Sequence, residues 1–215
     1  EIWISGRPGR AALGLAHLQG RTLLDESRRT DRIAALQRPQ PRVALGLALS
    51  GLATAAIDVS DGLLGDLRHI LEQSGLAARL QIAVSPAPTL ERQAWLAGGD
   101  DYELVFTSPA ARHAQIAALS LALDLPLTQI GVVAAGPAGQ IDLRDAGGGK
   151  IQVDHPGYDH FMSPQEAGTV SPCGAMVSCC AAPHIGCATL GAALRAALIR
   201  CSQDRRLSHR DSRGP

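Results

Sequence analysis

Lysine, aromatic residues and long apolar runs are all scarce in this sequence. Only one of its 20 basic residues is a lysine, and aromatic residues make up 3% of the chain. No apolar run approaches the roughly 18 residues that cross a bilayer, and no signal peptide opens the chain. Because 20 acidic residues balance the 20 basic ones, the chain has no global attraction to nucleic acid or to an anionic membrane. We therefore expect neither as a partner.

Cysteine is absent from residues 1–161, and all five cysteines lie beyond them. A cysteine-free body without a secretion signal is typical of a cytoplasmic protein that is held together by packing. Beyond residue 161 the apolar periodicity fades, and the cysteine spacings there match no familiar zinc site. We expect residues 1–161 to form one α/β domain and residues 162–215 to be an unrelated, disordered tail.

Apolar periodicity in residues 1–161 predicts a mixture of strands and helices. Strands are expected at 2–5, 53–57, 79–84, 102–107 and 127–133, with a hairpin of 140–143 and 150–153. Helices are expected at 11–18, 31–38, 43–52, 63–74, 90–96 and 110–123, the second capped by Thr30 or Asp31. The expected fold class is α/β (α+β): a mixed sheet packed with helices and followed by an irregular tail.

The chain is organised around the stretch Ile57-Asp58-Val59-Ser60-Asp61-Gly62-Leu63, where an apolar strand is followed by a helix that ends at Gly75. Two carboxylates and a hydroxyl are the oxygen ligands that Mg²⁺ prefers, often together with nucleotide phosphates. The alternative is that Asp61 caps the helix and Asp58 is a solvated strand-end residue. A carboxylate directly after a buried strand needs a partner, which favours the metal.

A second acidic stretch, Gly98-Gly99-Asp100-Asp101-Tyr102-Glu103, leads into the strand at 102–107. It is either a solvated turn or part of a ligand site. Glu103 stands between apolar neighbours, where an unpaired carboxylate is costly, which favours a ligand or metal role. A third stretch, Gly6-Arg7-Pro8-Gly9, is either a plain turn between a strand and a helix or a phosphate cradle at the helix N-terminus.

Several blocks together resemble thiamine-monophosphate kinase. The blocks are Ala44-Leu45-Gly46, residues 52–63 with the sequence LATAAIDVSDGL, residues 97–104 with the sequence AGGDDYEL, and Gly157-Tyr158-Asp159-His160-Phe161. The resemblance runs from about Glu1 to Phe161. It implies a domain like the C-terminal domain of PurM, the aminoimidazole ribonucleotide synthetase, with the family's N-terminal domain missing before Glu1. Arg10 departs from the family pattern, which has an acid there.

The resemblance implies phosphorylation of thiamine monophosphate to thiamine diphosphate, with ATP as co-substrate and Mg²⁺ as cofactor. Carried over, Asp58 and Asp61 are Mg²⁺ ligands, Ser60 contacts ATP, and Glu103 and Tyr158 contact the thiamine phosphate. Asp100 and Asp101 are weaker site candidates, and no residue is expected to act as a general acid or base. The family pairs as a homodimer through the missing N-terminal domain.

Two other functions stay open at this point. The chain could belong to another ATP-dependent synthetase of the same superfamily, which a substrate panel would distinguish. It could also be a non-catalytic domain that binds ligand, because a fragment without half of its site is inert by itself.

Overall fold

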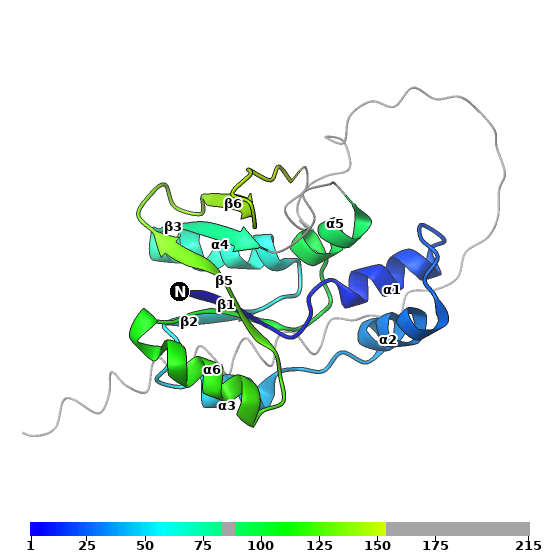
Figure 1. The fold of residues 1–215 in the computed structure, drawn as a ribbon, viewed down its shortest axis with the longest axis horizontal. Helices are drawn as coiled ribbons and strands as arrows, with labels where there is room; N and C mark the ends of the chain where they lie inside the picture. The colour runs from blue at the N-terminus through cyan, green and yellow to red at the C-terminus, as the bar shows by residue number, and fades with distance from the viewer. Residues whose placement is uncertain (83–88, 154–215) are drawn as a thin grey trace, which may run out of the picture. The chain divides into compact units, whose positions relative to one another are not determined.

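The computed structural model describes residues 1–82 and 89–153 of the chain, as an α+β domain (Figure 1). The strands are β1 (Ile2–Ser5), β2 (Ala55–Asp58), β3 (Ala77–Ile82), β4 (Leu104–Thr107), β5 (Leu127–Ala134) and β6 (Ile141–Asp145). The helices are α1 (Arg10–Leu18), α2 (Glu26–Gln37), α3 (Val43–Ala48), α4 (Leu63–Ser74), α5 (Leu90–Ala97) and α6 (His113–Ala122), with a short 3₁₀ turn at Ala110–Arg112 before α6.

Within the described residues one sheet contains six strands in the order β2-β4-β1-β5-β3-β6. Neighbouring strands are antiparallel except β3 and β6, which run parallel. The sheet is therefore mixed, which confirms the predicted fold class. The first strand in the sequence lies in the middle of the sheet, between β4 and β5, and is buried along its whole length.

Helices cover both faces of the sheet. Side chains alternate between the two faces along each strand, so each face has its own apolar cluster. Ile2 and Ile4 of β1 pack in one core cluster with the apolar side of α4. Trp3 points to the other face and packs with Phe106 of β4 in a second cluster that includes residues of α3 and α6. Figure 1 shows α4 above strands β1 and β2, and α3 and α6 below them.

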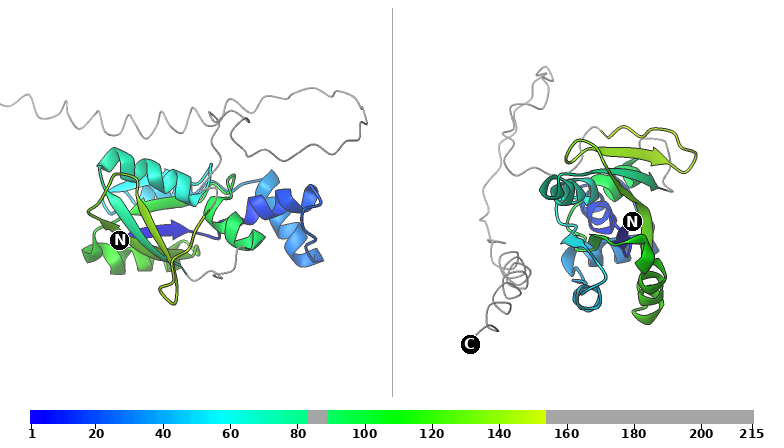
Figure 2. Two further views of the ribbon diagram at one scale, coloured as in Figure 1. Left: turned by 90° about the horizontal axis from the view of Figure 1, so that it is seen from above. Right: turned by 90° about the vertical axis from the view of Figure 1, so that its left-hand side faces the viewer.

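Helices α1 and α2 pack against each other beyond one end of the strands (Figure 2). A Cβ on Gly14 of α1 would lie 2.4 Å from the backbone oxygen of Arg32 in α2, so the two helices approach at backbone distance. The turn from β1 into α1 therefore connects the centre of the sheet to this helix pair.

Most predicted elements are confirmed, with four corrections. The predicted hairpin of 140–143 and 150–153 was wrong: β6 pairs in parallel with β3, and only an isolated bridge joins Arg144 to Lys150. The second helix begins at Glu26 and its N-cap is Asp25, so the predicted cap at Thr30 or Asp31 was wrong. The helix predicted over 43–52 ends at Ala48. Strand β4 begins at Leu104 instead of residue 102, because Tyr102 has a positive φ of 52° and leaves the extended conformation.

The chain divides into two compact units, Glu1–Glu166 and Ala167–Pro215. The second unit lies outside the described residues, so the boundary at 161 and the nature of the tail stay predictions. In the described part, no helix is long and apolar enough to span a membrane.

Candidate functional site

The two acidic stretches lie side by side in the structure. We call residues 58–62 the first acidic loop and residues 99–103 the second. The antiparallel pairing of β2 with β4 continues into these loops: Val59 N donates to Glu103 O at 2.7 Å, and Tyr102 N donates to Val59 O at 3.0 Å. Asp100 N donates to Ser60 O at 3.0 Å. Segments that are about 40 residues apart in the sequence thus form one continuous backbone ribbon.

Glycines allow this close approach. A Cβ on Gly99 would lie 2.2 Å from the backbone oxygen of Ser60, and a Cβ on Gly62 would lie 2.8 Å from the carbonyl carbon of Ala97. Contacts this short exclude any side chain at either position unless the loops move apart. The glycines in both motifs are therefore explained by packing of one loop on the other.

Asp66, in the first turn of α4, fixes the backbone of the first acidic loop through hydrogen bonds. Its Oδ2 accepts hydrogen bonds from Ser60 N at 3.0 Å and Asp61 N at 3.1 Å, and the residue is 2% exposed. Burial, together with the negative charges of Asp61 and Asp58, raises the pKa of Asp66 to about 6, against the lowering effect of the two backbone hydrogen bonds. The helix N-cap is Gly62 and no side chain caps it, so the alternative role of Asp61 as the helix cap was wrong.

Asp58 and Asp61 are half-buried at the junction of β2 and α4. Both carboxylates lie close enough to Asp66 for their negative charges to contribute to its raised pKa. No group of three or more metal-ligating side chains occurs within residues 1–82 and 89–153. Mg²⁺ commonly keeps several waters and binds through one or two carboxylates plus substrate phosphates. Asp58 and Asp61 are the residues of the first acidic loop that could hold such an ion.

Glu103, at the end of the second acidic loop, is 2% exposed and fully engaged. Its carboxylate accepts hydrogen bonds from Arg42 Nε at 2.7 Å and from Arg42 Nη2 at 2.6 Å, in a bidentate ion pair. Ser5 Oγ donates to the same carboxylate at 2.6 Å. This pairing raises the pKa of Arg42 through its hydrogen bonds with Glu103. A Cβ on Gly6 would lie 1.9 Å from Glu103 Oε1, so the absence of a side chain there makes room for the carboxylate.

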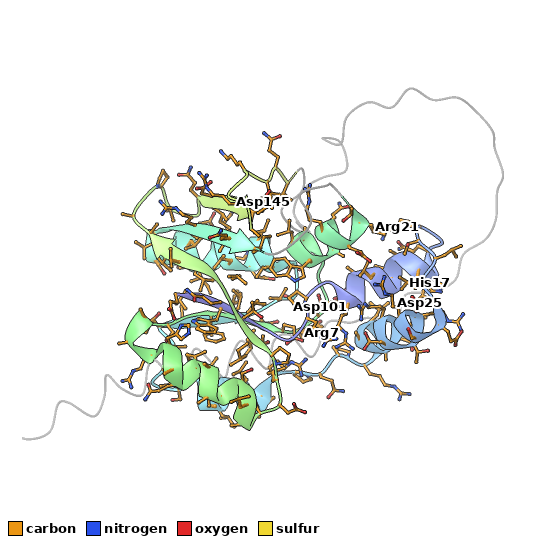
Figure 3. All side chains as sticks on the ribbon, in the orientation of Figure 1. Arg7, His17, Arg21, Asp25, Asp101 and Asp145 are labelled. Atoms are coloured by element: carbon orange, nitrogen blue, oxygen red, sulfur yellow. The ribbon has the colours of Figure 1, made fainter. Side chains whose placement is uncertain are left out.

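Asp101 occupies the N-terminus of α1. Its carboxylate accepts hydrogen bonds from Gly9 N and, at 2.9 Å, from Ala11 N. Burial raises the pKa of Asp101 to about 6, against these backbone hydrogen bonds. The alternative of a phosphate cradle at Gly6–Gly9 therefore fails at this helix end, because an internal carboxylate already takes its donors. Figure 3 shows Asp101 beside Arg7 where β1 runs into α1.

The remaining predicted residues are placed as follows. Ser60 is half-buried in the first acidic loop, and Asp100 is exposed in the second with a positive φ of 65°. Tyr158 lies outside the described residues. Sequence reasoning missed Asp66 and Arg42. Arg42 ends the segment Arg38-Pro39-Gln40-Pro41-Arg42, and two arginines around a rigid connector were the available signal.

The mixed sheet and the joined acidic loops define the class of protein. Residues 5–144 match the family of AIR synthase related proteins over their C-terminal domain. The chain belongs to this family.

Among individual relatives, the chain is similar to thiamine-monophosphate kinases. It is 39% identical over 173 residues to the thiamine-monophosphate kinase of Escherichia coli K12, which covers 76% of this chain and 53% of that protein. The crystal structure of the same enzyme from Stenotrophomonas maltophilia K279a superposes with a TM-score of 0.59 at 40% identity, covering 66% of this chain and 49% of that one. A protein called AaThiL, solved in complex with AMPPCP and TMP, superposes with a TM-score of 0.57 at 26% identity, covering 74% and 50%. The chain thus spans about half the length of the relatives that it matches.

Proposed function

We propose that this chain is the C-terminal half of a thiamine-monophosphate kinase, which transfers the γ-phosphoryl group of ATP to thiamine monophosphate. The observation that carries the proposal is the backbone pairing of the two acidic loops, within a fold that matches those kinases at 39–40% identity. The complex of AaThiL with AMPPCP and TMP supports the same pair of ligands for this chain.

In this proposal each loop has its own task. Asp58 and Asp61 hold Mg²⁺, and Ser60 between them contacts ATP. Glu103 lines the site of the thiamine phosphate, where its ion pair holds Arg42, and Tyr158 contacts the substrate. Asp66 keeps the backbone of the first loop in place by accepting the N–H groups of Ser60 and Asp61. Asp100 remains a weaker candidate, and the described contacts of Asp101 give it the role of a helix cap.

The reaction forms a bond between an oxygen of the acceptor phosphate and the γ-phosphorus of ATP, while the bond to the β,γ-bridging oxygen breaks and ADP leaves. The acceptor phosphate is already ionised near neutral pH, so it needs no strong general base. The main obstacle is the mutual repulsion of two anions that must approach in line. Bound Mg²⁺ would supply positive charge that screens this repulsion. The chain's own contribution is to hold its carboxylates in a preformed loop, so that little reorganisation is needed during transfer.

The isolated chain provides only part of such a site, and we propose that a preceding domain supplies the rest and pairs two copies as a homodimer. The expected cytoplasmic location stays a prediction.

The test is a chimera in which this chain replaces the matching 53% of the E. coli kinase. Formation of thiamine diphosphate from thiamine monophosphate, dependent on ATP and Mg²⁺, is expected. Asp58→Ala or Asp61→Ala is expected to lower turnover by at least ~10²-fold, on the scale of losing one preorganised charge-stabilising group. Asp124→Ala, which removes an exposed carboxylate beyond α6, is the matched control. Near-normal turnover of both loop variants at saturating Mg²⁺ would refute the metal assignment.

A further inference from the structure

Ser5, the last residue of β1, has a buried hydroxyl that joins two groups at the end of the second acidic loop. The residue is 0% exposed. Its Oγ donates a hydrogen bond to Glu103 Oε2 at 2.6 Å and accepts one from Leu104 N at 2.9 Å. Because a hydroxyl can donate and accept at once, a single atom meets both partners. Ser5 thus connects the carboxylate of Glu103 to the backbone of the residue that follows it.

The contacts of Ser5 help to set the direction in which the Glu103 carboxylate points. The last torsion of a glutamate side chain has broad preferences, so packing and hydrogen bonds decide it. Oε2 of Glu103 accepts from Arg42 Nε as well as from Ser5, and Oε1 accepts from Arg42 Nη2. A Cβ on Gly6 would lie 1.9 Å from Oε1, so the backbone of the β1–α1 turn packs directly against that oxygen. The end of β1 therefore fixes the carboxylate on both of its oxygens.

The direction of Glu103 in turn decides where the Arg42 guanidinium lies. Arg42 and Glu103 both line a cavity of about 230 Å³. The arginine side chain is 22% exposed and the glutamate side chain 3%, so the arginine is the more open of the two. Among residues 1–82 and 89–153, the side-chain hydrogen bonds of Arg42 both go to Glu103. A bidentate pair has a fixed geometry, so a rotated carboxylate would carry the guanidinium with it.

We propose that Ser5 is a positioning residue for thiamine monophosphate, acting through Glu103 on Arg42. The inference rests on the proposed function, in which Glu103 lines the site of the thiamine phosphate. Ser5 does not touch the substrate itself, because its side chain is buried and its hydrogen bonds are internal. Without the hydroxyl the carboxylate and its guanidinium are free to turn, and thiamine monophosphate binds more weakly. ATP and Mg²⁺, which the proposal assigns to the first acidic loop, keep their contacts.

The competing explanation is that Ser5 serves only the fold, by accepting the N–H of Leu104. In that case Ser5→Ala leaves a buried donor unsatisfied and lowers the stability of the domain. A smaller fraction of folded enzyme lowers the apparent kcat but leaves the KM of every substrate unchanged. A positioning role instead raises the KM for one substrate, because binding to that substrate is lost. The two explanations therefore differ in the KM for thiamine monophosphate.

The test is steady-state kinetics of the chimera with the E. coli kinase, with each substrate varied in turn. Ser5→Ala is expected to raise the KM for thiamine monophosphate roughly 10-fold, the size of one lost hydrogen bond to a charged group. The KM for ATP is expected to stay within about twofold of its unmodified value. Ser5→Thr keeps the hydroxyl at a strand position, where β-branched residues are favoured, and is expected to restore the KM for thiamine monophosphate.

Ser108→Ala is the matched control. Ser108 is also buried, at 3% exposed, and its Oγ donates to Leu52 O at 3.0 Å, but it follows β4 at the end opposite to Glu103. This variant is expected to keep both KM values. No turnover by the unmodified chimera would refute the proposed function and the positioning role with it. Turnover with an unchanged KM for thiamine monophosphate in Ser5→Ala, or an equal rise in Ser5→Thr or Ser108→Ala, would refute the positioning role alone.

Discussion

Replacing Asp101 with asparagine is expected to destabilise the chain more at about pH 4 than at about pH 7.5. The carboxylate accepts hydrogen bonds on both oxygens, from Gly9 N and Ala11 N. Asparagine offers one oxygen and turns an NH₂ group toward the other donor. Relative to the ionised carboxylate, one hydrogen bond is therefore lost and one buried N–H is left unsatisfied, which costs about 1–3 kcal/mol at about pH 7.5.

The dependence on pH comes from the raised pKa of Asp101, which burial moves from 3.8 to about 6. A group whose pKa is higher in the folded state stabilises the fold fully below its unfolded pKa. That contribution is lost as the pH rises through the folded pKa. The difference between 3.8 and about 6 corresponds to about 3 kcal/mol. About 2 kcal/mol of it falls between pH 4 and pH 7.5, because part of the titration lies below pH 4.

Asparagine does not ionise, so the variant lacks this loss. Its destabilisation relative to the unmodified chain is thus expected to be about 2 kcal/mol greater at about pH 4 than at about pH 7.5. Urea unfolding, followed by the fluorescence of Trp3 and Trp95, measures both free energies at each pH. Asp124→Asn is the control, since it neutralises an exposed carboxyl at a positive φ of 46° that asparagine tolerates. An equal destabilisation at the two pH values would show that Asp101 titrates alike in the folded and unfolded chains.

Two further substitutions test the contacts that hold the acidic loops. Arg42→Ala leaves the buried carboxylate of Glu103 without its guanidinium partner. The free energy of unfolding, measured in urea, is expected to fall by about 3–5 kcal/mol. A loss below about 1 kcal/mol, which is the range of surface ion pairs, would contradict the buried ion pair. Gly99→Ala places a Cβ 2.2 Å from Ser60 O and is expected to cost about 1–3 kcal/mol. Gly46→Ala in α3, where the new Cβ would lie 3.9 Å from its nearest neighbour, is the tolerated control. Equal stability of the two alanine variants would argue against close packing of the loops.

The sequence by itself determined the element order and the two acidic motifs. Apolar spacing was sufficient to predict helix α4, because Leu63, Leu67 and Leu71 repeat on one face and Gly75 ends the helix. Apolar residues were also sufficient to predict β1, whose four residues are all buried. Apolar spacing did not predict where elements begin and end. The strand period continued through Tyr102, but a positive φ there ends the extended backbone two residues before Leu104.

Only the tertiary structure decided which partner each acid has. Asp66 has the residue type and position of an ordinary polar residue in a first helical turn, yet its carboxylate supports the first acidic loop. Glu103 pairs with Arg42, 61 residues away, and Asp101 caps a helix 90 residues away. Apolar burial is set by local periodicity and can be read along the chain. The pairing of buried charges depends on which strands and turns meet in space, and no local pattern encodes that.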